Sequence, residues 1–168
     1  MAYGTTAAGT ITKEQTLLSI RRLPIAASTT ITKGNVCNPD TDGNLVVSTT
    51  GQVAEVPHYV ALETVVNSGA AAAAYCPVAV TGHFVTVVAD NVIVAGERVV
   101  SSGATAGQVI AYVAASHTID QVVGVYTGKE GGVVSKSGST PYLESMTDGA
   151  DFSPADAADG DVIEIQLI

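Results

Sequence analysis

The stretch VAVTGHFVTVVA, residues 78–89, is the longest run of strand-forming residues in this sequence of 168. Its β-branched side chains fit a pleated, half-buried surface better than a helix. We expect the run to be central in a sheet, with Gly82 at a bulge or a close backbone approach. The preference extends over the whole chain, because 25 Val, 10 Ile and 19 Thr stand against only 7 Leu. The sequence therefore predicts an all-β fold.

Short strands separated by turns lie on both sides of this run. Residues 36–47 predict a hairpin around a polar turn at 38–44, and another strand begins near His58. Further strands are expected at 109–113 and 119–126. The 17 Gly and 6 Pro recur at short intervals, as tight turns between many short strands require.

Two patterns concern the organisation of the strands. The turn motif of residues 31–36 recurs within residues 91–100, at a separation of 62 positions. The last strand, 162–168, alternates apolar and polar residues, which predicts one buried face and one face in water. An apolar terminal strand of this kind is expected to pair inside a sheet.

We predict a small β-barrel or β-tulip-like single domain over residues 25–168, preceded by an N-terminal arm at residues 1–24. Residues 12–23 depart from the strand pattern, and they predict either one helical turn or an arm that lies on another molecule. The length of the chain suits one domain with a single core.

The charge balance limits the classes of partner. The chain has 16 acidic and 7 basic side chains and a net charge of −9, which repels nucleic acid and anionic membrane surfaces. We therefore expect neither partner. No run of about 18 apolar residues predicts a membrane span. Residues 1–10 lack the cationic start and apolar stretch of a secretory signal, so synthesis in a cytoplasm is expected.

No residue pattern predicts a catalytic, cofactor or metal site, and we expect the protein not to be an enzyme. His58, His83 and His117 are too widely spaced to suggest a metal cluster, although a site assembled across subunits around His58 or His83 stays open. Residues 40–44 (DTDGN) resemble the start of a calcium loop, but Gly51 stands where a bidentate Glu is needed, which favours a simple turn.

Two further predictions concern the state of the two cysteines and the role of the acidic residues near the C-terminus. Cys37 and Cys76 are predicted to be reduced and buried in preference to a disulfide. The acidic C-terminal region favours a solvated loop. Cation binding at a subunit junction remains an alternative for five of its residues: Asp148, Asp151, Asp156, Asp159 and Asp161.

Seven short motifs follow one another between residues 33 and 165: KGNV (33–36), GNLV (43–46), AEVPHYVALE (54–63), GHF (82–84), NVIVAGERVV (91–100), VVGV (122–125) and DGDVIEI (159–165). In their order and spacing the chain resembles the capsid decoration, or cement, proteins of tailed double-stranded DNA viruses. The resemblance implies a structural virion protein that forms a homotrimer and contacts the major capsid protein. It also implies a place on the outer surface of the expanded icosahedral head, which the trimer stabilises without catalysis.

The N-terminal arm supplies the candidate capsid or subunit interface. Seven residues are predicted to contribute to it: Tyr3, Lys13, Leu17, Leu18, Ile20, Arg21 and Arg22. The first 33 residues carry four of the seven basic side chains, whereas residues 144–164 carry seven acids and no base, so copies of the chain could attract one another. The alternative function is a carbohydrate-binding or adhesin-like β-module. The absence of Trp and an aromatic content of 5% weigh against that alternative.

Overall fold

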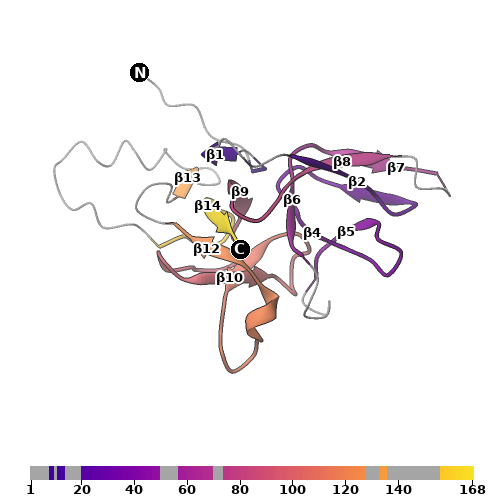
Figure 1. Ribbon diagram of the computed structural model, residues 1–168. Coiled ribbons are helices and arrows are strands. Elements are labelled where there is room, and N and C mark those ends of the chain that lie inside the picture. The colour runs from indigo at the N-terminus through magenta and orange to yellow at the C-terminus, as the bar shows by residue number, and fades with distance from the viewer. Residues whose placement is uncertain are drawn as a thin grey trace, which may run out of the picture.

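The structure is a computed structural model that describes residues 8–9, 11–13, 20–49, 57–69, 74–127, 133–135 and 156–168, with the backbone alone described at 11–13 and 133–135. The predicted all-β class is confirmed, because the strands form three antiparallel sheets (Figure 1). The described part also contains one 3-10 turn, η1 (Ile119–Gln121). The described strands do not show a closed barrel.

The five-stranded sheet has the order β2-β8-β6-β4-β5. Its strands are β2 (Arg21–Pro24), β4 (Val36–Pro39), β5 (Leu45–Val47), β6 (Tyr59–Ala61) and β8 (Tyr75–Ala79). A two-stranded sheet joins β3 (Thr29–Ile31) to β7 (Val65–Asn67). The predicted hairpin is confirmed as β4–β5, and the strand expected near His58 is β6.

The seven-stranded sheet has the order β1-β9-β14-β12-β10-β11, and β13 also pairs with β14. Its strands are β1 (Ile11–Lys13), β9 (Phe84–Val88), β10 (Arg98–Ser101), β11 (Val109–Ala111), β12 (Val122–Tyr126), β13 (Val133–Ser135) and β14 (Val162–Leu167). The terminal strand β14 lies between β9 and β12, as its apolar sequence predicts.

The two larger sheets share one topology. The strands β2, β4, β5, β6 and β8 are arranged in the first sheet as β9, β10, β11, β12 and β14 are arranged in the second, in the same chain order. We call β2 to β8 the first repeat and β9 to β14 the second repeat; β1 and β13 are additions to the second sheet. The turn motif that recurs after 62 positions in the sequence is thus one part of a larger structural repeat.

The strand register agrees between the repeats residue by residue. Cys37 lies opposite Val47, and Val99 lies opposite Ala111, with offsets of 62 and 64 positions. Other pairs correspond in the same way: Arg21↔Val78 with Val85↔Ile165, Val36↔Val60 with Arg98↔Val125, and Ala61↔Val78 with Tyr126↔Ile165. A single shift in pairing would reverse the face of every side chain in a strand. The agreement therefore extends to which residues face each core.

Within each repeat, the chain just after the first strand approaches the third strand, although these two strands lie at opposite ends of the strand order. A parallel bridge joins Ile25, just after β2, to Leu45 of β5. The corresponding bridge in the second repeat joins Ala89, just after β9, to Val109 of β11, and both residues are offset by 64 positions. The backbone N–H of the next residue donates to the bridged strand in each case, from Ala26 to Leu45 at 3.2 Å and from Asp90 to Val109 at 2.8 Å.

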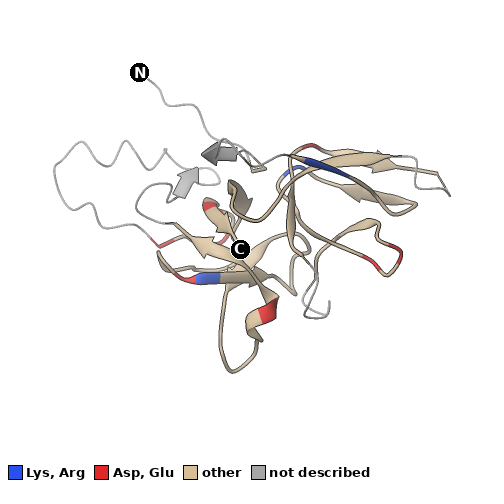
Figure 2. Cartoon of the chain, viewed as in Figure 1, with Lys and Arg blue, Asp and Glu red and all other residues tan. Residues whose placement is uncertain are grey.

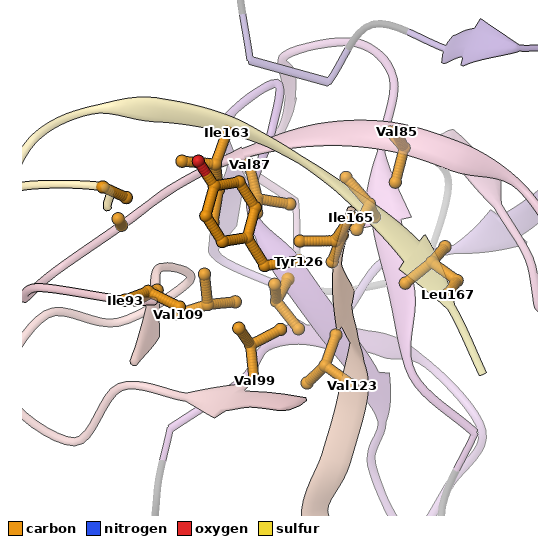
Figure 3. Packing of buried hydrophobic residues seen from close by; sticks show 14 of the residues in the cluster. Val85, Val87, Ile93, Val99, Val109, Val123, Tyr126, Ile163, Ile165 and Leu167 are labelled. Atoms are coloured by element: carbon orange, nitrogen blue, oxygen red, sulfur yellow. The ribbon is translucent and has the colours of Figure 1, made fainter. Parts of the chain in front are cut away.

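The buried residues form two hydrophobic cores, one within the first repeat and a larger one built mainly by the second repeat, to which Val36, Val60 and Ala79 of the first repeat also contribute. The core of the first repeat consists of Ile25, Ile31, Cys37, Leu45, Tyr59, Ala61, Cys76 and Val78. Seven of these eight positions correspond to core residues of the second repeat: Ala89, Ile93, Val99, Val109, Tyr126, Ile163 and Ile165. Figure 3 shows the Tyr126 ring among the aliphatic side chains of that second core.

The remaining core residue of the first repeat is Tyr59, whose counterpart in the second repeat is Gly124. In β6 the large residue is Tyr59 and the small one is Ala61. At the corresponding positions of β12 the order is reversed, with Gly124 followed two residues later by Tyr126. A Cβ at Gly124 would lie 2.5 Å from the Gln166 carbonyl oxygen, so this position has no room for a side chain. Exchanging large and small residues within a strand preserves close packing.

The run at residues 78–89 does not form one strand. It is divided between β8 and β9, which belong to different sheets, and each of these two strands lies in the interior of its sheet. Gly82 has a φ of 93° within the turn, and the His83 N–H donates to the Val80 carbonyl at 3.1 Å. Gly82 thus lies in the turn between the repeats and not at a bulge within one strand, because β8 and β9 belong to different sheets. Glycine adopts this φ without steric cost.

The prediction of a solvent-facing side for the last strand is wrong at its centre. Glu164 is buried, and its carboxylate accepts a hydrogen bond from the Thr127 hydroxyl at 2.8 Å. Thr86 lies opposite Glu164 in β9 and is also buried. An alternation of apolar and polar residues predicts which side chains share one face of a strand, but it does not predict whether another part of the chain covers that face.

Candidate functional site

Three residues of the predicted interface lie at the edge of the first repeat. Arg21 and Arg22 begin β2, where the strand is blue in Figure 2. Ile20 precedes them, and all three residues are exposed. The sequence predicts an N-terminal arm or a helical turn for residues 21–23, and it places Pro24 at the end of the arm. The structure places them in a strand that pairs with β8, with Leu23 opposite Cys76. Leu23 packs partly against the first core, which explains why this segment joins the sheet.

Of the other predicted interface residues, Lys13 alone is among those that the structure describes. Lys13 lies in β1, where the backbone is opposite Phe84 of the second repeat. Tyr3, Leu17 and Leu18 lie outside the described residues, as do Asp148 and Asp151 of the acidic region. We call the exposed residues Ile20, Arg21 and Arg22 the β2 edge.

The β2 edge combines polar and apolar features. Ile20 is 49% exposed, although isoleucine is usually buried. Neither guanidinium forms an ion pair with a carboxylate in the described part of the chain. Tyr75, opposite Pro24 at the other end of β2, is 55% exposed. An exposed strand edge with two cations beside apolar side chains is suited to binding an extended, acidic partner.

A small pocket lies between the two repeats. Its volume is about 20 Å³, which is room for about one water molecule. The lining residues are Ser48, Thr49 and His58 from the first repeat with Val100, Ser101, His117 and Gln121 from the second. Ser101 donates its hydroxyl hydrogen to Ser48 at 2.7 Å. Nothing in the sequence indicates that His58 and His117 line one pocket, since they are 59 positions apart and share no motif.

The two histidines of this pocket have different partners. Burial lowers the pKa of His58, and a hydrogen bond with the Asp120 backbone raises this pKa by a smaller amount. The buried Nδ1 of His58 has no hydrogen-bond partner among the described residues. His117 accepts a hydrogen bond from the Val113 N–H at 2.9 Å, and its ring lies 6.0 Å from that of Tyr112. These contacts favour two structural histidines around one solvent-sized space.

His83, the other histidine of the open enzyme hypothesis, lies away from this pocket. Its ring is fully buried, and Nδ1 lies 2.9 Å from the Val80 carbonyl across the Gly82 corner. Its Nε2 has no partner among the described residues. The structure thus does not bring His83 together with His58, and it gives His83 a place in the corner between the repeats.

The polar turn at residues 38–44 is held by Asp40. One carboxylate oxygen accepts hydrogen bonds from the backbone N–H groups of Asp42 at 2.9 Å and Asn44 at 2.8 Å. These bonds are typical of an Asx turn, which is the simpler reading of the DTDGN motif. Asp161 similarly accepts from the Ala158 N–H at 2.7 Å. Within the described ranges, no group of three or more His, Cys, Asp or Glu side chains could hold a metal ion.

Both cysteines are free and buried, as predicted. They lie in the first core, and burial is the main cause that raises the pKa of each thiol. A thiol with a raised pKa is a poor nucleophile at neutral pH. Cys37 and Cys76 therefore contribute packing, and their counterparts in the second repeat are Val99 and Ile163.

Comparison with known proteins gives no family for this chain. No protein-family model matches it, and no curated protein matches it either. Among the described residues, none of the helical structure has the length and apolar character needed to cross a membrane.

Proposed function

We propose that this protein is a structural virion protein that binds the outside of an icosahedral capsid as a homotrimer and stabilises the expanded head. The proposal begins from the resemblance of the sequence motifs to capsid decoration proteins. The all-β fold, with two strand repeats and short turns, is compatible with such a role. In this account the major capsid protein is the partner, and no bond is made or broken.

The observation that carries the proposal is the β2 edge. It exposes Ile20, Arg21 and Arg22, the three described residues of the predicted interface that lie together, in a chain of net charge −9. Positive groups on an otherwise acidic protein favour a specific contact over general adhesion. A trimer that makes three such contacts at once binds firmly even when each contact is weak.

The polar side chains of the described part support a building role in a second way. Several of them hold turns: Asp40 binds two backbone N–H groups, and Asp90 accepts hydrogen bonds from the Ser102 and Thr105 hydroxyls. Bonds of this kind fix the loops between short strands. A rigid surface binds with a smaller entropy cost than one that must be ordered on contact.

Light scattering and capsid sedimentation test the proposal together. The purified chain is expected to have the mass of a trimer and to sediment with expanded capsids of the virus that encodes it. Unexpanded capsids are the control, and they should retain less of the protein. A strict monomer that does not bind expanded capsids would contradict the proposed function.

A further inference from the structure

The second repeat shows what covers the outer edge of its first strand. In that repeat β14 pairs with one edge of β9, and β1 pairs with the other. Ile11 of β1 lies opposite Val85, and Lys13 lies opposite Phe84. Val85 and its neighbour Thr86 are fully buried. A strand of this same chain therefore fits against an edge with this backbone geometry.

The corresponding edge of the first repeat has no such cover in the described part of the chain. The register makes Ile20, Arg21 and Arg22 the counterparts of Phe84, Val85 and Thr86, each offset by 64 positions. The strand β2 pairs with β8 and is last in the order of its sheet. Where the second repeat has buried Val85 and Thr86, the first has two exposed arginines. An uncovered strand edge is a template for pairing with another chain.

The charge at this edge selects what can pair with it. Two copies of β2 placed edge to edge would bring four guanidinium groups together, which like-charge repulsion disfavours. A segment with carboxylates would instead meet Arg21 and Arg22 favourably. The chain itself is rich in carboxylates, since it has 16 acidic side chains and seven of them lie in residues 144–164 without a base. Asp161 and Glu164 are buried within the fold, so the remaining five are the ones that could meet a partner.

We infer that the β2 edge is a strand-addition site, and that its occupant is an extended, carboxylate-bearing segment of a second copy of this chain. Main-chain hydrogen bonds at Ile20 and Arg21 supply the pairing, as they do between β9 and β1 in the second repeat. The arginines set the choice of partner. Because the donor and acceptor surfaces differ, the contact is head-to-tail and can close into a ring such as a trimer. This inference rests on the proposed function, whose homotrimer it explains.

Charge reversal in the full-length chain tests the inference. The variants are Arg21→Glu and Arg22→Glu, singly and together, and the matched control is Arg98→Glu, which reverses an exposed arginine on β10. Circular dichroism and thermal unfolding establish that each variant is folded. The double variant is expected to weaken self-association at least tenfold by sedimentation equilibrium, and the control should assemble as the wild type does. Raising the salt concentration should weaken only the wild type and the control.

Hydrogen exchange separates strand addition from a contact of side chains alone. In the assembled wild type, the backbone amides at the β2 edge should exchange slowly, and they should exchange quickly in the double variant. A folded double variant that assembles like the wild type overturns this inference and leaves the proposed function standing. Fast exchange at the edge in an assembled wild type also overturns it. A wild type that stays monomeric overturns it whatever the chain does on capsids.

Discussion

Asn35 and Glu97 hold equivalent turns with the same hydrogen bond. The Asn35 side-chain oxygen accepts from the Thr32 N–H at 2.8 Å, and the Glu97 carboxylate accepts from the Val94 N–H at 2.8 Å. The two residues are 62 positions apart and differ in charge and length. Asn35 nevertheless fixes the turn that leads into β4, and Glu97 fixes the turn that leads into β10. The repeat is therefore defined by backbone geometry, which different side chains can support.

The glycines of these turns give the first prediction. Gly34 and Gly96 have nearly the same φ, 86° and 85°, so alanine at either site adopts a left-handed conformation that costs about 1–2 kcal/mol. A Cβ at Gly34 would also lie 2.4 Å from the Ala8 Cβ, whereas a Cβ at Gly96 meets nothing within 4 Å. Gly34→Ala should destabilise the protein by about 1 kcal/mol or more beyond Gly96→Ala.

Urea unfolding of both variants measures this difference, with Gly96→Ala as the matched control. Equal losses in the free energy of unfolding would show that the segment at Ala8 and Gly9 does not pack on the first repeat as the structure has it.

The second prediction uses one repeat as a guide to substitutions in the other. Cys37 corresponds to Val99, and both are fully buried. Cys37→Val should change the free energy of unfolding by less than about 1.5 kcal/mol, because it enlarges the side chain by only about one methylene group and adds no polar group. Cys37→Ser should cost about 1–3 kcal/mol, because it buries a hydroxyl in an apolar core.

Chemical denaturation of the two variants beside the wild type checks the ranking. If serine were tolerated better than valine, the correspondence between the two cores would fail at this position.

The third prediction concerns pH. Burial lowers the pKa of His58 in the folded state below its ordinary value of 6.5, so the unfolded state binds the proton more readily between the two values. Stability should therefore fall as the pH is lowered through 6.5 towards the folded pKa, and it should be restored above 6.5. The variant His58→Gln should show a smaller loss over the same interval.

Thr49→Ala is the control, since Thr49 lines the same pocket and does not titrate. Unfolding free energies at pH 7.5, 6.5 and 5.5 give the comparison. A His58→Gln variant with the slope of the wild type would show that the pH dependence has another origin.

Much of the fold could be predicted from local sequence. The hairpin β4–β5, the strand at His58 and the pairing of the last strand follow from β-branched residues, turn residues and apolar alternation. The motif that recurs after 62 positions correctly indicated equivalent turns. These features depend on neighbours in the chain, and local patterns report them well.

The predictions that failed concern contacts between residues that are far apart in the sequence. Nothing local distinguishes Gly82 as a corner between sheets from Gly82 as a bulge within one strand. Glu164 reads as solvent-facing, but it is covered and bonded to Thr127. Placing residues 21–24 in an arm overlooked their strand pairing with β8, which an alignment of the two halves of the chain would have indicated. His58 and His117 meet only because the repeats pack together.

The candidate site was predicted in part. Ile20, Arg21 and Arg22 are exposed at one edge, whereas Lys13 lies on the other sheet. The open edge itself follows from comparing the two repeats, since β1 covers one and no described strand covers the other.

Electron cryo-microscopy of expanded capsids incubated with the purified chain tests the central claim most directly. The account predicts additional density on the outer surface, at three-fold or quasi-three-fold positions, into which three copies of this two-repeat structure fit. Capsids with no added density, or with density on the inner surface only, would contradict it.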